Sequence, residues 1–125
     1  RQLNAKRNAT LTARFSGRRP TRGRVAEVFD SLGLAGLERR LPGQLSGGQQ
    51  QRVAVARALL AQAPYIFADE PTGALDDATA STVLSHLRAA ARDGASVVMV
   101  THSHLAAEAA DRIISLEEVA HAGVA

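Results

Sequence analysis

The sequence has no cysteine and no tryptophan among its 125 residues, and only 3% of them are aromatic. Without cysteine, the chain can form no disulfide framework and no thiolate metal site, which fits a reducing compartment. The hydrophobic fraction is nevertheless 46%, so a core must be built from Ala, Val, Leu and Ile. A chain of this length makes one domain or part of one.

Long apolar runs and early acidic residues are also missing. No apolar run approaches the ~20 residues that cross a bilayer, and no secretory signal is visible. The chain starts at Arg1 rather than Met, which suggests a fragment or a truncated gene. A basic block lacking aromatic partners other than Phe15 favours a solvated face over a nucleic-acid or lipid surface. The basic residues that precede the first acidic residue, Glu27, are Arg1, Lys6, Arg7, Arg14, Arg18, Arg19, Arg22 and Arg24.

The first half of the chain favours helices. The spacing of its apolar residues predicts a helix or a strand at 8–15, a helix at 21–32, a short helical turn at 34–41 and a helix at 46–61. Thr21 and Ser46 each stand where a helix N-cap belongs, and Gly33 can end the first long helix. Pro42 and Gly43 break the chain between the last two elements.

From Pro64 onward, short apolar runs alternate with helical patterns. Strands are expected at 65–68, 96–100 and 112–116, and helices at 77–92 and 103–110. This β-α-β-α-β order argues for a parallel sheet with helices packed on it. The helical stretch before it indicates a subdomain inserted ahead of the sheet.

Polar side chains follow two of the expected strands at the point where each ends. Asp69 and Glu70 follow the first strand, and His102 follows the second. Ligands gather at the C-terminal ends of strands in open parallel sheets, and paired carboxylates there suit Mg²⁺ and an activated water. A nearby histidine can donate to a phosphate or steer a proton. Each feature alone also fits a solvated turn or a structural histidine.

The segment Leu45–Arg52 reads LSGGQQQR at the expected start of a helix. Gly47 and Gly48 expose backbone N–H groups there, and the helix dipole favours an anion at the same place. Ser46 and Gln49 add side-chain donors. The residues therefore fit a phosphate-binding helix start, and they fit equally a capped helix with a flexible glycine entry.

Together these segments resemble the motifs of ATP-binding cassette (ABC) ATPases. LSGGQQQR resembles their signature motif. The run AVARALLAQAPYIFADEPTGALD (Ala54 to Asp76) resembles the signature helix, the Walker B strand and the D-loop. The run VVMVTHSHLAAEAADRIISL (Val97 to Leu116) resembles the strand of the switch histidine and the segment after it. PTGALD (Pro71 to Asp76) is similar to the form in macrolide-export and lipoprotein-releasing type ATPases.

The resemblance implies a role for each matching residue, with ATP and Mg²⁺ as the bound groups. Asp69 would hold Mg²⁺ through its water shell, and Glu70 would orient and polarise the attacking water. His102 would contact and sense the γ-phosphate, and Asp76 would communicate across a dimer interface. The residues that would contact the γ-phosphate of ATP bound on a partner subunit are Ser46, Gly48 and Gln49, with Gly47 allowing the close approach. Phosphoryl transfer depends on such positioning more than on covalent chemistry.

The resemblance also implies a fold class and a division of the chain. The fold class is α/β, an incomplete P-loop NTPase-like parallel sheet with helices, preceded by part of the ABC helical subdomain. Residues 1–63 would be the partial helical subdomain that ends in the signature helix. Residues 64–116 would be the partial α/β core, and 117–125 a divergent tail.

The sequence contains no G-x-x-x-x-G-K-[ST] and no visible Q-loop. In a whole cassette both precede the part that matches here, so we expect a fragment without the phosphate-binding loop. The implied function is ATP binding and hydrolysis in the motor subunit of an ABC transporter. The expected partners are a second ATP-binding cassette and a membrane permease subunit, with no nucleic acid. The expected location is cytoplasmic, on the inner face of the cell membrane.

Two other functions stay open. A truncated, non-enzymatic remnant that still docks on a partner cassette would show no ATP turnover and no effect of changing Glu70 to Gln. A non-transport ABC ATPase, acting in DNA repair, chromosome handling or translation, draws slight support from the basic N-terminus. Such proteins usually carry long insertions or a second cassette, and the sequence suggests neither.

Overall fold

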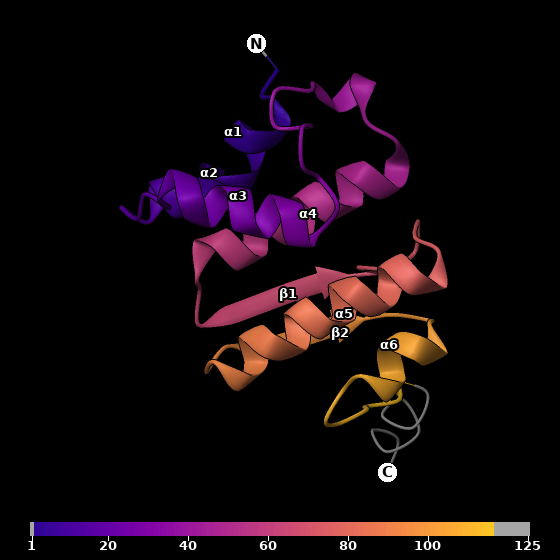
Figure 1. The fold of residues 1–125 in the computed structure, drawn as a ribbon. Coiled ribbons are helices and arrows are strands. Elements are labelled where there is room, and N and C mark those ends of the chain that lie inside the picture. The colour runs from indigo at the N-terminus through magenta and orange to yellow at the C-terminus, as the bar shows by residue number, and fades with distance from the viewer. Residues whose placement is uncertain (1, 117–125) are drawn as a thin grey trace.

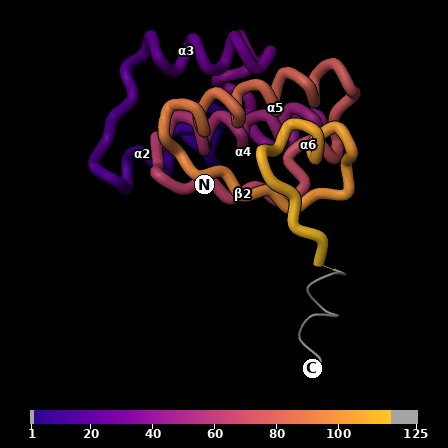
Figure 2. Tube along the Cα trace, turned by 90° about the horizontal axis from the view of Figure 1, so that it is seen from below, coloured from indigo at the N-terminus to yellow at the C-terminus, as the bar shows by residue number. Residues whose placement is uncertain are grey.

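The computed structural model describes residues 2–116, arranged as Figure 1 shows. Helices α1, α2 and α3 pack on α4, and α4 in turn contacts α5. Figure 2, seen from below, shows α5 running alongside α4. In chain order the elements are α1 (Ala5–Ala9), α2 (Leu11–Phe15), α3 (Arg22–Ser31), the 3-10 helix η1 (Pro42–Gln44), α4 (Gly47–Ala61), β1 (Tyr65–Asp69), α5 (Asp77–Arg92), β2 (Ser96–Val100) and α6 (His104–Glu108).

Side-chain caps start the two long helices of the first half, as their sequences predict. The hydroxyl of Thr21 accepts a hydrogen bond from the Arg24 N–H at 3.1 Å and begins α3. The hydroxyl of Ser46 accepts from the Gln49 N–H at 3.2 Å and begins α4. Each bond satisfies one of the first N–H groups, which have no partner inside the helix. The helices expected at 21–32, 46–61 and 77–92 are confirmed.

The C-terminal end of α4 is closed by a side chain from the segment between α2 and α3. Gln62 follows α4 in the left-handed conformation, with φ +47°. The guanidinium Nη1 of Arg18 donates to the carbonyl of Ala61 at 3.3 Å and to the carbonyl of Gln62. The last carbonyls of a helix lack intrahelical donors, and the Arg18 guanidinium supplies N–H donors to them at the end of α4.

One segment had two expected structures, and another differs from the structure expected for it. Residues 8–15, which fit either a helix or a strand, are helical in α1 and α2. The helical turn expected at 34–41 is a pair of tight turns instead, the first closed by the Leu37 N–H donating to the Leu34 carbonyl at 3.0 Å. Gly36, inside the first turn, has φ +82°, which lies outside the right-handed helical region.

The sheet consists of β1 and β2 paired in parallel within the described residues. Tyr65 lies opposite Ser96, and Asp69 lies opposite Val100. Helix α5 is the connection between the two strands, as a parallel pair requires. The ends of both strands therefore meet at one edge of the sheet, which is where the sequence places its candidate residues.

The two faces of the sheet differ in burial. Ile66 is buried in the core, and Val97 and Met99 pack against that core on the same face. Parallel sheets are normally covered on both faces, so the exposure of the opposite face is unusual. On that face the exposed large hydrophobic residues are Tyr65 at 64%, Phe67 at 79%, Val98 at 50% and Val100 at 57%.

The prediction of a third strand at 112–116 is wrong. Residues 112–115 have no strand pairing, and the described sheet contains β1 and β2 alone. A segment becomes a strand only when a neighbour satisfies its N–H and C=O groups, and β-branched residues do not replace that partner. Ile113 and Ile114 are 68% and 64% exposed. The helix expected at 103–110 is present as the shorter α6, and the tail at 117–125 lies outside the described residues.

One cluster of buried side chains runs from the N-terminal helices to the sheet. Its largest fully buried members are Phe29, Leu34 and Val83, which come from α3, from the turn after it and from α5. Val55 and Leu60 of α4 belong to the same cluster, so α4 fixes the helical part to the sheet. The division of the chain at residue 63 stays a prediction.

Candidate functional site

The Glu70 side chain, directly after β1, is bonded to residues that follow β2. Its Oε1 accepts from the backbone N–H of His102 at 2.8 Å, and its Oε2 accepts from the Thr101 hydroxyl at 3.0 Å. The register that sets Asp69 opposite Val100 brings these two strand ends together. Each carboxylate oxygen has more than one acceptor site, so Glu70 can still accept a hydrogen bond from a water.

The backbone of Glu70 is held in an unusual conformation. Its φ is +45°, in the left-handed region that residues with a Cβ rarely adopt. The Glu70 N–H donates to the Val100 carbonyl at 2.8 Å, and the Glu70 carbonyl accepts from the Gly73 N–H at 3.1 Å. Backbone strain of this kind costs on the order of 1–3 kcal/mol and persists where surrounding contacts hold it.

Asp69, just before Glu70 in the chain, and His102 are open to solvent. The Nε2 atom of His102 lies 4.0 Å from Glu70 Oε1, and the His102 side chain is fully exposed at 101%. Asp69 is exposed at the end of β1. Among residues 2–116, no three or more His, Asp or Glu side chains are grouped so that they could hold a metal ion. Mg²⁺ usually takes one or two carboxylates together with substrate phosphates, so Asp69 fits a metal that arrives with a nucleotide.

The start of α4 combines a capping box with two glycines. The Ser46 N–H donates to Gln49 Oε1 at 2.9 Å, and the Gln49 N–H donates to Ser46 Oγ. This reciprocal pair satisfies two of the first N–H groups of the helix. In the described part of the chain the N–H groups of Gly47 and Gly48 are left for another acceptor. The interpretation as a capped helix is therefore confirmed, and donors for an anion remain.

Helix α4 lies close to the segment between β1 and α5 at Gly48. A Cβ built on Gly48 would stand 3.1 Å from the Ala74 carbonyl oxygen and 3.2 Å from Leu75 Cδ2. Nothing lies within 4 Å of a Cβ built on Gly47. Asp76 ends the segment at the N-cap position of α5, exposed and without a side-chain capping bond. Gly48 is thus required by close packing, and Gly47 faces open space.

The two glycines should respond differently to the same substitution. Gly48→Val is expected to lower the free energy of unfolding by about 1–3 kcal/mol, because its Cβ would stand 3.1 Å from the Ala74 carbonyl oxygen and crowd it. Gly47→Val, with open space around it, is the matched control and should cost well under that amount. Urea unfolding of both variants measures the difference, and equal unfolding free energies would show that the close approach at Gly48 does not exist.

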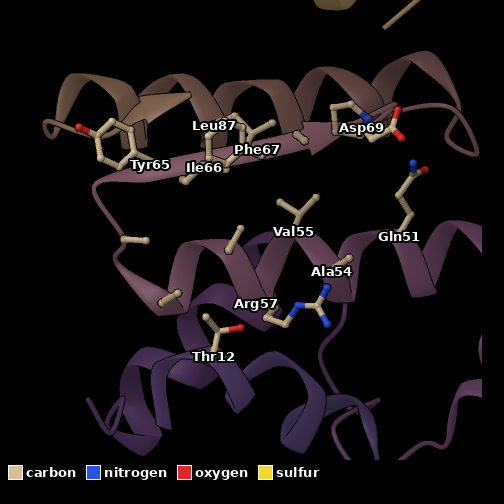
Figure 3. A pocket seen from close by; sticks show the side chains of 15 residues that line it. Thr12, Gln51, Ala54, Val55, Arg57, Tyr65, Ile66, Phe67, Asp69 and Leu87 are labelled. Carbon is tan, nitrogen blue, oxygen red and sulfur yellow. The ribbon is translucent and has the colours of Figure 1, made fainter. Parts of the chain in front are cut away.

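An open pocket of about 380 Å³ lies between α4 and β1 (Figure 3). Val55 from α4 and Ile66 from β1 contribute to its apolar walls, and Gln51 and Asp69 lie together at one end. Glu70 and His102 do not line it. The pocket therefore adjoins the candidate site at Asp69 without being that site.

Two residues of the site were missed from the sequence. Thr101 holds Oε2 of Glu70, and its place between a strand end and His102 could have suggested it. Gln51 contacts both ends of the segment that follows Glu70. It lies three residues after Gly48, on the same face of α4, and that spacing is the signal that could have found it.

The family model described as ABC transporter matches residues 1–73. The chain belongs to the ABC transporter family. The resemblance carried by the segments at 45–52, 54–76 and 97–116 is therefore confirmed at the level of the family.

Two relatives of this ABC chain illustrate the match. It is 45% identical over 119 residues to the macrolide export ATP-binding/permease protein MacB of Sodalis glossinidius (strain morsitans), covering 94% of the chain and 18% of the relative. It is 38% identical over 119 residues to the uncharacterized ABC transporter ATP-binding protein YknY of Bacillus subtilis (strain 168), covering 94% and 52%. The chain spans about half the length of YknY and much less of MacB. The similarity to macrolide-export type cassettes is confirmed.

Solved structures of ABC cassettes resemble this chain as well. The dimeric structure of MJ0796, a bacterial ABC transporter cassette, matches with a TM-score of 0.76 at 40% identity, over 86% of this chain and 49% of that one. A dimeric structure of MJ0796 in a post-hydrolysis state, bound to ADP and phosphate, matches with a TM-score of 0.76 at 39% identity over the same shares. The predicted α/β fold class is confirmed, because the helices and the small parallel sheet match part of a nucleotide-binding ABC cassette.

Proposed function

We propose that this chain supplies two parts of the ATP-hydrolysing motor of an ABC transporter. One part is the start of α4, and the other is the edge of the sheet at Glu70. The observation that carries the proposal is the pair of hydrogen bonds that joins the Glu70 carboxylate to Thr101 and His102 across two strand ends. The roles proposed for these groups in ATP hydrolysis come from the chain's membership of the ABC family.

The edge of the sheet prepares the attack of water on the γ-phosphate. The Glu70 carboxylate, held through both oxygens, orients the attacking water and accepts the proton that this water loses. Asp69 would hold Mg²⁺ through its water shell, and the ion would neutralise charge on the phosphates when it is bound with ATP. The exposed His102 side chain contacts the γ-phosphate from the second strand.

The start of α4 serves ATP that is held by another subunit. Gly47 and Gly48 offer backbone N–H groups, and the hydroxyl of Ser46 and the amide of Gln49 keep donor hydrogens after capping. Since the chain contains no G-x-x-x-x-G-K-[ST], the grip on the β- and γ-phosphates comes from residues outside it. The γ-phosphate therefore lies between two protein surfaces, with Asp76 near their boundary.

A second cassette and a membrane permease are the partners that this function requires. MJ0796 forms a dimer, and MacB is named as a combined ATP-binding and permease protein. Within the described residues, no helix is long and apolar enough to cross a bilayer. We place the chain on the cytoplasmic face of the cell membrane, where it could bind a permease and where ATP is available. The absence of a nucleic-acid partner stays a prediction.

A chimaeric cassette tests the proposal. In this joined cassette the chain replaces the segment of MJ0796 that it matches, so the remaining half of MJ0796 brings the phosphate-binding loop that the family resemblance places there. We expect ATP hydrolysis well above the rate without protein, measured as phosphate release with Mg²⁺. A joined cassette that folds and binds ATP but never releases phosphate would favour the non-enzymatic remnant.

A further inference from the structure

The side chain of Gln51 bridges α4 to both ends of the segment that follows Glu70. Its Nε2 donates to the Glu70 carbonyl, and its Oε1 accepts from the Ala74 N–H at 3.0 Å. Figure 3 shows Gln51 on α4 directed toward the end of β1. One amide group therefore fixes a backbone segment that neither β1 nor α5 holds by itself.

The first of these bonds bears on the orientation of the Glu70 carboxylate. Glu70 has φ +45°, and its carbonyl is held by the Gly73 N–H and by Gln51. If that peptide rotated back to a relaxed conformation, the Cα–Cβ bond would turn with it. The carboxylate would then leave the His102 N–H.

The second bond acts with the close packing at Gly48. Gly48 meets the Ala74 carbonyl and Leu75, and Gln51 bonds the Ala74 N–H from the same face of α4. The carbonyl and the N–H of Ala74 therefore both lie against the first turns of α4. A small movement of the start of α4 is transmitted to Glu70, because packed contacts of this kind shift together rather than stretch.

We propose that Gln51 is a positioning residue that couples the start of α4 to the Glu70 carboxylate. This inference rests on the proposed function, in which α4 contacts ATP on the partner subunit and Glu70 acts on ATP in its own. Gln51 then links two ATP sites within one chain. Occupation of one site alters the alignment of Glu70 in the other.

Gln50 provides a matched control beside it on the same helix. The Gln50 amide donates to the Pro42 carbonyl at 2.9 Å and to the Leu45 carbonyl at 3.3 Å. It has no contact with the segment after Glu70 among these bonds. Gln50→Met and Gln51→Met therefore remove the same amide group, but only Gln51→Met removes the bridge to the segment after Glu70.

The first test uses the chain itself, labelled with ¹⁵N and free of nucleotide. Gln51→Met should speed water exchange of the Ala74 amide about fivefold, the loss expected for one net hydrogen bond, and should shift the His102 amide resonance. Gln51→Glu keeps an oxygen for the Ala74 N–H but no donor for the Glu70 carbonyl. It should shift His102 while leaving Ala74 exchange within about twofold of wild type.

Several results would overturn the proposal. One is an Ala74 exchange rate unchanged by Gln51→Met, and another is the same response to Gln50→Met. A uniform rise in exchange throughout α4 and α5 would reduce Gln51 to a general stabilising residue. Because these measurements need no ATP, they stand apart from the proposed function.

The second test uses the joined cassette. Gln51→Met should lower kcat about tenfold and leave KM for ATP within about twofold, since it misaligns a group that acts in the transition state. The kcat of Gln51→Glu and that of Gln51→Met should both be lower than the kcat of Gln50→Met, which should keep wild-type turnover. Normal kcat in Gln51→Met would overturn the proposal, whereas a cassette with no turnover in any form, wild type included, would instead contradict the proposed function.

Discussion

Changing Glu70 to Gln in the joined cassette should lower ATP turnover by about 10²–10⁴-fold, the usual contribution of a positioned general base. The amide keeps the shape of the side chain: its one oxygen can still accept from the His102 N–H, and its NH2 group can donate to the Thr101 hydroxyl oxygen. It carries no negative charge to polarise the attacking water. ATP should therefore still bind, and phosphate release in the steady state is the measurement.

Glu108→Gln is the control for this substitution. Glu108 lies exposed on α6 and makes none of the contacts that hold Glu70, so its change should leave turnover within about twofold. Equal turnover in the Glu70→Gln and Glu108→Gln cassettes would remove Glu70 from the reaction.

Phe29→Ala should lower the free energy of unfolding of the chain by about 3–5 kcal/mol. Phe29 is completely buried on α3, in the cluster that also contains Val28 and Leu34, and its removal leaves a cavity in that cluster. Domains are stable by only about 5–15 kcal/mol, so much of the variant should be unfolded at low urea concentrations.

Phe15→Ala makes the same chemical change at a residue that is 84% exposed on α2. It should alter the unfolding free energy by less than about 0.5 kcal/mol. Urea unfolding followed by circular dichroism compares the two variants. A Phe29→Ala chain as stable as Phe15→Ala would mean that the helical cluster does not support the fold.

The elements that carry their own boundary signals could be predicted from the sequence. Helix α5 and strand β2 have the bounds expected for them, because the spacing of apolar residues marks the helix and β-branched residues mark the strand. Helix α4 followed from Ser46. These signals are local, so they needed no knowledge of the tertiary structure.

Elements that depend on a distant partner could not be predicted in the same way. The apolar residues at 112–116 carry a strand pattern, yet pairing depends on another strand, and the described residues provide none. Residues 8–15 alternate only weakly, which fits a helix or a strand, and their packing against α4 decides for helix. In both cases tertiary contacts outweigh local preference.

The candidate site shows the same division. Asp69, Glu70 and His102 could be assigned to one edge of the sheet, since parallel strands end together. The bond between the Glu70 carboxylate and the His102 N–H depends on a backbone conformation that no sequence pattern signals. The bridge from Gln51 spans segments that only folding brings together. The roles of all these residues in ATP hydrolysis remain predictions.

The composite nature of the site can be measured by mixing two inactive forms of the joined cassette. Gly47→Asp sets a negative charge at the start of α4, where open space allows the side chain to fit and the charge repels a phosphate. Glu70→Gln disables the other half. In a symmetric dimer, a mixed pair contains one site with an intact α4 start and an intact Glu70.

Each variant alone should be inactive, and an equal mixture should recover up to about a quarter of wild-type ATP turnover, because half of the dimers are mixed and each has one working site of two, whose rate the coupling through Gln51 can lower. Phosphate release by the mixture, beside each variant alone, gives the answer directly. Recovery near that level is the result predicted here. A mixture no more active than its components, although the subunits exchange, would mean that α4 and Glu70 serve the same ATP within one subunit and would contradict the account.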